Sequence, residues 1–166
     1  MKTTDNQNEL FIVVDENDNV VDYRTRGECH SDKSLIHRSV QIVLFDNEGK
    51  VLMQKRSMTK DLYPGYFTVS ASGHVDKGES YESTAKRELF EEIGLDVPLE
   101  FKTKFLLKNT LESEYVALFT GKFEGELKLN ASEVETVEYV APQDVESLRS
   151  QIAPTAIRSF EELGIL

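Results

Sequence analysis

The chain has 166 residues, 39% of them hydrophobic and 30% charged, with a formal net charge of −11 at pH 7. This length and composition are ordinary for one globular domain with a sizeable core. The acidic balance argues against a nucleic-acid polymer as the partner. We also expect no membrane contact and no secretion, because no long apolar run is present and MKTTDNQNEL lacks the apolar segment of a signal peptide. A single cysteine, Cys29, excludes an internal disulfide and is typical of a reducing cytoplasm.

The first half of the chain is predicted to be mostly β-structure. Residues 1–8 are polar, and we expect them to be frayed. Apolar runs bounded by turn-forming residues then predict two hairpins and one further strand, which are 10–14 with 20–21, 39–45 with 50–54, and 66–71.

Residues 80–93 have the clearest helical pattern. Ser80 is a residue type that caps helix N-termini, and Gly94 stands where a glycine commonly ends a helix. The apolar residues are spaced by four, at Ala85, Leu89 and Ile93. We therefore expect a helix with one face on a core.

The rest of the chain is predicted to form strands and then helices. Three apolar segments predict strands, at 99–107, 115–123 and 134–140, and two segments that begin with proline predict helices, at 142–148 and 154–163. Strands on both sides of a central helix, with helices at the end, indicate an α+β sandwich rather than a regular βαβ series. We expect residues 9–166 to form a single domain.

Three carboxylates of the predicted helix indicate a metal site. Glu88, Glu91 and Glu92 fall at i, i+3 and i+4, so they share one face of a helix. Carboxylates this close repel one another unless a cation lies among them, and hard oxygen ligands suit Mg²⁺ or Mn²⁺. Such metals commonly serve phosphate chemistry.

The segment 73–95 resembles the Nudix box, the signature of the Nudix hydrolase superfamily. Its pattern is filled at every position, by Gly73, Glu79, Arg87, Glu88, Leu89, Glu91, Glu92, Gly94 and Leu95. A solvated helix face does not explain the glycines and the arginine in register. The resemblance implies an α/β/α sandwich with a mixed sheet and the Nudix loop-helix-loop. It also implies hydrolysis of a nucleoside diphosphate linked to another group, or of a similar small phosphorylated metabolite.

The same resemblance implies a role for each polar residue of the box. The implied ligands of Mg²⁺ or Mn²⁺ are the carboxylates of Glu88, Glu91 and Glu92 with the carbonyl group of Gly73. Arg87 is implied to pair with Glu79 or Glu91 and so to orient the ligands. Water attacks phosphorus while the metal neutralises charge on the diphosphate. The general base stays open between Glu91, Glu92 and a carboxylate on a later loop.

Residues 9–120 also resemble the branch that contains type I isopentenyl-diphosphate isomerase and its hydrolase-like relatives. The likeness is carried by ELFIVVDENDNVV, the Cys29-His30 pair, LIHRS and KRSMTKDLYPGYFT. It implies a second metal site with the ligands His30, His37, His74, Glu112 and Glu114, a donor set that suits Zn²⁺, Mn²⁺ or Mg²⁺. It also implies that Arg56 and Lys60 hold the substrate phosphates.

The chain departs from the isomerase at two catalytic positions. Where the isomerase has its catalytic cysteine this chain has Ser72, and a hydroxyl is a much weaker acid than a thiol. The tryptophan that stabilises the isomerase's carbocation is missing, and Tyr139 lies near the matching place. The isomerase also has a degenerate Nudix box, whereas this one is complete. Hydrolysis is therefore favoured.

Simpler interpretations and other functions stay open. The histidines could be ordinary hydrogen-bonded side chains, Glu112 and Glu114 a solvated pair, Arg56 and Lys60 surface cations, Cys29 an inert thiol and Ser72 backbone support beside the box. An isomerase and a non-catalytic ligand-binding Nudix module are the alternative functions. The sequence leaves the substrate and the oligomeric state, a homodimer included, undetermined.

Overall fold

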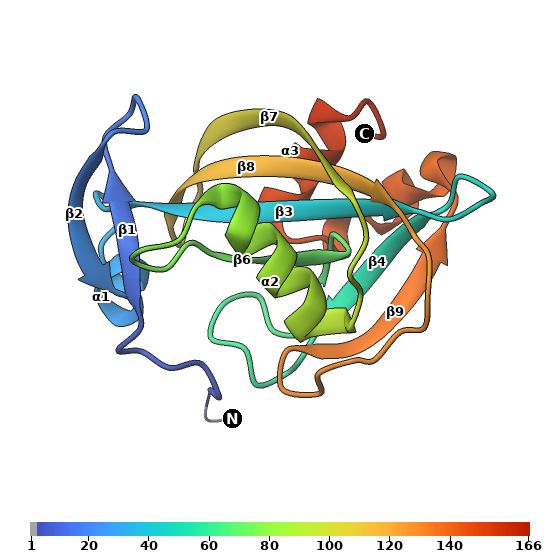
Figure 1. Ribbon diagram of the computed structural model, residues 1–166, viewed down its shortest axis with the longest axis horizontal. Coiled ribbons are helices and arrows are strands. Elements are labelled where there is room, and N and C mark those ends of the chain that lie inside the picture. Colours follow the sequence, from blue (N-terminus) through green and yellow to red (C-terminus); the bar gives the residue numbers. More distant parts are fainter. Residues whose placement is uncertain (1–2) are drawn as a thin grey trace.

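The computed structural model describes residues 3–166, and strands dominate it (Figure 1). The strands are β1 Leu10–Val14, β2 Val20–Thr25, β3 Ile36–Phe45, β4 Val51–Arg56, β5 Phe67–Thr68, β6 Ala71–His74, β7 Leu99–Lys108, β8 Ser113–Lys122 and β9 Val134–Val140. The helices are α1 Arg26–Ser31, α2 Tyr81–Ile93, α3 Pro154–Glu162 and the 3₁₀-helix η1 Pro142–Gln151. All the strands belong to one sheet.

β3 is the centre of this sheet. β8 pairs with it in parallel over its full length, from Ile36 opposite Ser113 to Phe45 opposite Lys122. Along its other edge β1, β6 and β4 follow one another, each antiparallel to β3. The predicted mixed sheet is therefore confirmed, and β3 is buried along almost its whole length, as a central strand must be.

Helices cover both faces of the sheet (Figure 1). On one face α2 packs its apolar side onto alternate residues of β3, so that Leu89 shares a core with Val40 and Ile42. On the other face α3 packs Phe160 into a second core with Val43. Successive side chains of a strand point to opposite faces, so β3 serves both layers. The expected α/β/α sandwich is confirmed.

Two elements differ from their prediction. The strand expected over 66–71 is divided into β5, which pairs with β4, and β6, which pairs with β3. Ser70 makes the crossing, because its hydroxyl donates to Leu52 O and accepts from Leu44 N–H. The helix α1 was not expected. It has only six residues, too few for a hydrophobic period, and it begins with a capping box between Thr25 and Glu28.

The N-terminal segment also differs from its prediction. Residues 1 and 2 lie outside the described part of the chain, but residues 3–8 run along the 57–61 loop rather than fraying. Thr4 N–H donates to Thr59 O at 3.0 Å, and the Asp5 side chain is only 4% exposed and pairs with Lys60. The polar composition of this segment thus reflects hydrogen bonds and ion pairs made with another loop, which a local pattern does not reveal.

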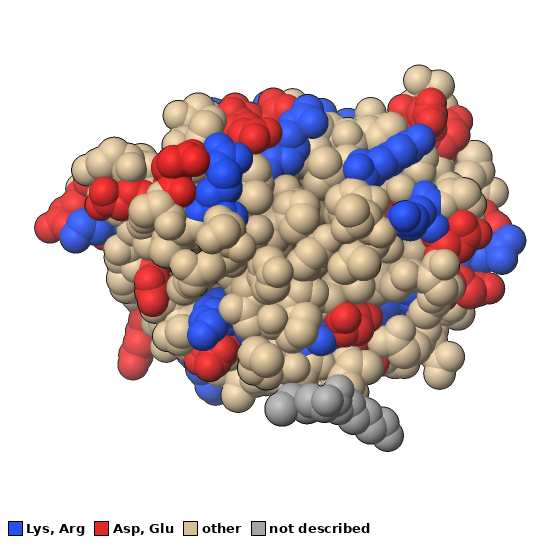
Figure 2. Space-filling model, turned by 180° about the vertical axis from the view of Figure 1, so that it is seen from behind, with Lys and Arg blue, Asp and Glu red and all other residues tan. Residues whose placement is uncertain are grey.

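Figure 2 shows the molecule from behind the view of Figure 1. On this face Lys and Arg side chains are interspersed with Asp and Glu around a broad uncharged area. It therefore presents no continuous positive surface to a polyanion. Across residues 3–166, none of the helices combines the length and the apolar character that crossing a membrane requires.

Candidate active site

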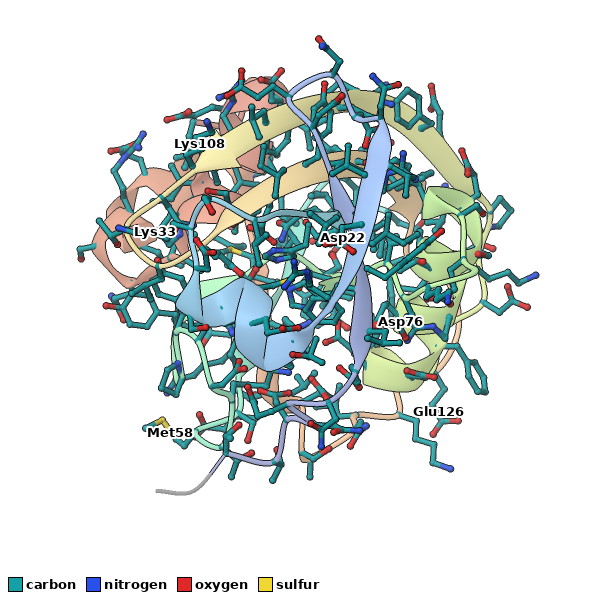
Figure 3. All side chains as sticks on the ribbon, turned by 90° about the vertical axis from the view of Figure 1, so that its left-hand side faces the viewer. Asp22, Lys33, Met58, Asp76, Lys108 and Glu126 are labelled. Carbon is teal, nitrogen blue, oxygen red and sulfur yellow. The ribbon has the colours of Figure 1, made fainter. Side chains whose placement is uncertain are left out.

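A cavity of about 230 Å³ lies between the N-terminal segment, β6 and α2. Of the site residues predicted from the sequence, all except His37 and Glu79 line it. Figure 3 views this end of the molecule with α1 in front, and the labelled Asp76, which also lines the cavity, lies beside α2. The three glutamates on α2 and most of the predicted His/Glu group therefore face one common space.

The helix that carries the box begins and ends where the sequence predicts. Ser80 caps the first turn, and Gly94 ends the helix with a φ of 75°, a left-handed conformation that glycine adopts without strain. These bounds place Glu88, Glu91 and Glu92 within about one turn, and all three line the cavity.

Glu92 is the most firmly held of these carboxylates. Its residue is 3% exposed, and its Oε1 accepts hydrogen bonds from Ser72 N–H at 2.8 Å and from Gln54 Nε2 at 3.1 Å. Ser72 thus contributes its backbone to the site, beside Gly73. Both hydrogen bonds end on Oε1, so the second carboxylate oxygen of Glu92 has no hydrogen-bond partner among the described residues.

The box carboxylates are short of positive charge. Burial raises the pKa of Glu92 to about 7, and the Glu133 carboxylate adds to the rise. Burial and the neighbouring Glu92 raise the pKa of Glu88 well above its usual range. Buried carboxylates that repel one another in this way fit a divalent cation, which would replace the protons they otherwise retain.

Gly73 lets β6 approach α2 at the site. A Cβ atom at this position would overlap the carboxyl group of Glu88. The glycine therefore brings its own backbone next to the Glu88 carboxylate, which is the place the resemblance assigns to its carbonyl group.

Arg87 joins the carboxylates of the box to one another. It donates two hydrogen bonds to Glu79, at 2.7 and 2.8 Å, one to Glu88 at 2.7 Å and one to Glu91 at 3.1 Å. The sequence left its partner open between Glu79 and Glu91, and the structure has both. A guanidinium held by several carboxylates restrains the orientation of each of them.

A second group of metal-type ligands forms on the other side of the cavity. His30 from α1, His37 from β3, His74 from β6 and Glu112, directly before β8, bring one ligand atom each within 4.8 Å of one another. Glu112 Oε2 lies 3.1 Å from His30 Nε2 and 3.2 Å from His37 Nε2. The predicted histidines are therefore one cluster, although they come from three separate elements.

The donor atoms of this cluster are buried and unsatisfied. Among the residues described, His30 Nε2, both ring nitrogens of His37 and Glu112 Oε2 have no partner in hydrogen-bonding geometry, despite the short distances. Burial and nearby cations such as Arg26 hold the pKa of His74 well below its usual value, so this ring is neutral. Unpaired buried imidazoles around one carboxylate fit a borderline divalent cation such as Zn²⁺ or Mn²⁺.

Glu114 stands apart from the cluster to which the resemblance assigned it. Its Oε1 is 3.9 Å from His37 Nε2, and its Oε2 accepts a hydrogen bond from the Thr155 hydroxyl at 2.6 Å. Glu112 and Glu114 are both buried, so they are not a solvated pair. The structure thus assembles four of the five implied ligands and places the fifth in a neighbouring hydrogen bond.

His30 is oriented by a pair of residues that the sequence patterns did not identify. Asp61 Oδ2 lies 3.1 Å from His30 Nδ1, and the same carboxylate receives two hydrogen bonds from Arg26, at 2.9 and 3.0 Å. Although burial opposes it, contact with Asp61 and Glu112 raises the pKa of His30 to about 9. A carboxylate on Nδ1 directs Nε2 toward the cluster, the usual arrangement behind a ligating histidine.

The two predicted phosphate-binding cations, Lys60 and Arg56, differ in burial and in their ion pairs. Lys60 is buried, and its Nζ lies 2.6 Å from both Asp5 and Glu133, so it is not a plain surface cation. Arg56 lines the cavity, and its side chain makes one hydrogen bond within the described chain, from Nε to Leu62 O at 3.1 Å. Arg56 is therefore the more accessible of the two to an incoming anion.

Two further positions bear on the chemistry. Glu133, on the loop before β9, lines the cavity next to the box. The sequence predicted that a carboxylate on a later loop could lie here, but it did not identify Glu133. Tyr139, near the place of the isomerase tryptophan, is 44% exposed, packs against Phe123 and does not line the cavity. No aromatic ring from that strand therefore faces the site.

Comparison with known proteins agrees with this geometry. The family model described as the NUDIX domain matches residues 35–163. The chain is 36% identical over 137 residues to a protein of Photorhabdus laumondii named isopentenyl-diphosphate Delta-isomerase 2, covering 80% of this chain and 77% of that protein. It is also 36% identical over 142 residues to a protein of Methanosarcina mazei named prenyl-diphosphate phosphatase, covering 82% and 81%.

The fold recurs in solved structures. A crystal structure from Deinococcus radiodurans superposes with a TM-score of 0.79 at 22% identity, covering 95% of this chain and 99% of that one. The family match spans most of the chain and includes the complete box. The chain therefore belongs to the Nudix hydrolase family, whose enzymes act on pyrophosphate bonds.

Proposed function

We propose that this protein is a divalent-metal-dependent hydrolase that cleaves the diphosphate linkage of a small phosphorylated metabolite. The single observation that carries the proposal is the group of Glu88, Glu91 and Glu92 on one turn of α2, facing a cavity beside Gly73. These residues would hold Mg²⁺ or Mn²⁺. When bound, the metal would neutralise charge on the diphosphate and lower the pKa of attacking water.

The chain's own residues orient and neutralise the reactants. Arg87 fixes the box carboxylates relative to one another, and Gln54 with the backbone of Ser72 fixes Glu92. Arg56 would contact the substrate phosphates, since its guanidinium faces the cavity with a single side-chain hydrogen bond within the described chain.

The general base comes from one of three carboxylates. Glu91 is the most exposed of the three α2 carboxylates that face the cavity, with 53% of its side chain accessible and Arg87 as its partner. Glu92 has a pKa of about 7, which suits proton transfer near neutral pH, but a metal ligand would lose that proton. Glu133 is the carboxylate on a later loop, and it lies close enough to raise the pKa of both Glu88 and Glu92.

The cavity favours a small substrate. Its volume of about 230 Å³ is below the usual range for sites of drug-sized ligands, and most of its lining groups are polar. The relative from Methanosarcina mazei named prenyl-diphosphate phosphatase makes short prenyl diphosphates the first compounds to test. We expect the enzyme to work in a reducing cytoplasm, which the buried single thiol of Cys29 supports.

Isomerisation of an allylic diphosphate is the second candidate. It is favoured by the cluster of His30, His37, His74 and Glu112, and by the relative named as an isomerase. Ser72 and the exposed position of Tyr139 count against it, because neither supplies the acid or the ring face that such a reaction needs.

The test compares the purified protein with a Glu91→Gln/Glu92→Gln variant in Mg²⁺ or Mn²⁺. Substrates are prenyl diphosphates and nucleoside diphosphate derivatives, and products are separated by chromatography. We expect the parent to split the diphosphate, which gives two phosphate monoesters from a nucleoside diphosphate derivative and a prenyl monophosphate with phosphate from a prenyl diphosphate. The double variant should lose at least about 1,000-fold in kcat/KM. Glu124→Gln/Glu126→Gln, which removes the same charge from an exposed loop, is the control. Full activity in the first double variant refutes the proposal, and a shifted double bond without released phosphate supports the isomerase.

A further inference from the structure

A strap formed by residues 3–9 crosses from β1 to the loop that carries Lys60. In Figure 3 the labelled Met58 marks that loop beside the N-terminal segment. The strap is fastened by backbone bonds at its two ends, from Thr4 N–H to Thr59 O at 3.0 Å and from Arg26 N–H to Glu9 O at 2.8 Å. Thr4, Asp5, Asn6 and Glu9 line the cavity, so the strap forms part of its wall.

Within the strap, the side chain of Asp5 is buried and reaches two cations. Its carboxylate accepts from Lys60 Nζ at 2.6 Å and from the backbone N–H of Asp61 at 2.9 Å, and lies 3.3 Å from Arg26 Nη2. The side chain is 4% exposed. Two cations and a backbone N–H converging on one buried carboxylate make a cradle for an anion.

This cradle already holds more negative than positive charge. Arg26 also pairs with Glu9 and Asp61, and Lys60 also pairs with Glu133. Among the described residues, Arg26 and Lys60, together with His30 beside Asp61, thus serve four carboxylates counting Asp5. A diphosphate that entered the cavity would be repelled unless one carboxylate withdrew.

The four carboxylates are not equally able to withdraw. Asp61 is held by two bonds to Arg26 and one contact with His30. Glu133 belongs to a loop whose backbone is bonded to Ser57 and Asn130. Glu9 directly precedes β1 and, within residues 3–166, pairs with one cation, Arg26. Asp5 lies on the strap, and its removal would free Lys60 and one face of Arg26 together.

We propose that Asp5 is a built-in anion that occupies a phosphate subsite made by Lys60, Arg26 and the Asp61 N–H, and that an incoming diphosphate displaces it. The inference rests on the proposed function, since it supplies the site for the substrate's phosphates. Asp5 then lowers the affinity for every phosphorylated ligand, and the strap sets which ligands bind well enough to displace it.

The test measures binding of inorganic pyrophosphate to the full chain by calorimetry, in EDTA, so that neither catalysis nor a metal is required. We expect Asp5→Asn to tighten binding by at least about fivefold, because it removes the competing charge while keeping a side chain of the same shape. Asp5→Ser, a second variant, should tighten it as well. Combining Asp5→Asn with Lys60→Met should abolish the gain.

Two control variants remove one negative charge each, as Asp5→Asn does. Glu9→Gln acts on the strap and on Arg26 but not on Lys60, and Asp22→Asn acts on the exposed pair with Arg24. We expect Asp22→Asn to change the affinity less than about twofold, and Glu9→Gln, which relieves Arg26 alone, to tighten it less than Asp5→Asn does. Unchanged or weaker binding in a folded Asp5→Asn protein overturns the inference, as does equal tightening by Asp22→Asn. Because the readout is pyrophosphate binding, a protein without hydrolase activity would still decide the question.

Discussion

The backbone of Gly73 lies directly against the carboxyl group of Glu88. A Cβ at position 73 would overlap three side-chain atoms of Glu88, including one carboxylate oxygen. The contact joins the edge of β6 to the buried face of α2, and it sets how closely the two elements approach at the site. The glycine of the box thus leaves space for the Glu88 carboxylate.

Gly73→Ala should therefore impair the site more than the fold. The added methyl group displaces the Glu88 carboxylate, and a misplacement of about 1 Å in a catalytic group commonly lowers the rate about 100-fold. We expect a loss of that size in kcat/KM with far-UV circular dichroism unchanged. Gly27→Ala adds the same methyl group where the nearest neighbour is 3.4 Å away, and it should retain activity. Equal activity of the two variants would contradict the prediction.

Glu112 and Glu114 should differ in their effect on the histidine cluster. Glu112→Gln removes the carboxylate that lies beside two histidines, and we expect metal affinity there to fall at least about 100-fold. Glu114→Gln keeps the hydrogen bond with Thr155 and should cost less than about tenfold. The measurement is Zn²⁺ or Mn²⁺ titration followed by elemental analysis after dialysis. Equal losses in the two variants would favour five ligands over four.

Glu92 should make the metal-free protein less stable as the pH rises from about 4.5 to 7. Burial raises the pKa of Glu92 from an ordinary 4.5 to about 7. Within this window the folded protein holds a proton that the unfolded chain has released, so the free energy of unfolding decreases with pH. The decrease attributable to this group is on the order of 1–3 kcal/mol. Urea unfolding in EDTA at several pH values measures it.

Glu92→Gln should weaken this dependence, and Mg²⁺ should oppose it. Glu92→Gln removes one titrating group and should make the fall in stability between pH 4.5 and 7 smaller than in the parent, whereas Glu126→Gln, on an exposed loop, should leave it unchanged. Mg²⁺ should stabilise the parent more at pH 8 than at pH 5, because it binds the deprotonated form. A parent curve identical to that of Glu92→Gln would show that the carboxylate ionises normally.

Asp18, which does not line the cavity, should contribute strongly to the stability of the fold. Its side chain is 5% exposed and accepts from Arg38 Nε at 2.7 Å, Tyr81 OH at 2.8 Å and Lys104 Nζ at 2.7 Å. It joins the turn after β1 to β3, α2 and β7. Asp18→Asn should cost about 2–3 kcal/mol, because it leaves two cations without their shared carboxylate.

The backbone at this position determines the choice of variant. Asp18 has a φ of 64°, which asparagine tolerates, so the substitution isolates the loss of charge. Asp22→Asn, whose pair with Arg24 is about half exposed, should change stability by less than about 0.5 kcal/mol. Denaturant titration of both variants checks the difference, and a small effect at Asp18 would mean that the cluster is solvated.

The sequence by itself determined the features that depend on neighbours along the chain. The capped helix from Ser80 to Gly94 and the spacing of Glu88, Glu91 and Glu92 follow from helical geometry, since residues three and four apart share a face. The hairpins around β1 and β3 follow from turn residues between apolar runs. The complete box also established the family.

Only the tertiary structure decided which groups meet across the cavity. Lys60 pairs with Asp5 and Glu133, partners 55 and 73 positions away, and no local pattern specifies such contacts. The same holds for Asp61 behind His30, for Glu114 turning to Thr155, and for Ser70 dividing a predicted strand. The hydrogen bonds of a helix close within four residues, whereas these pairings depend on how the sheet brings distant loops together.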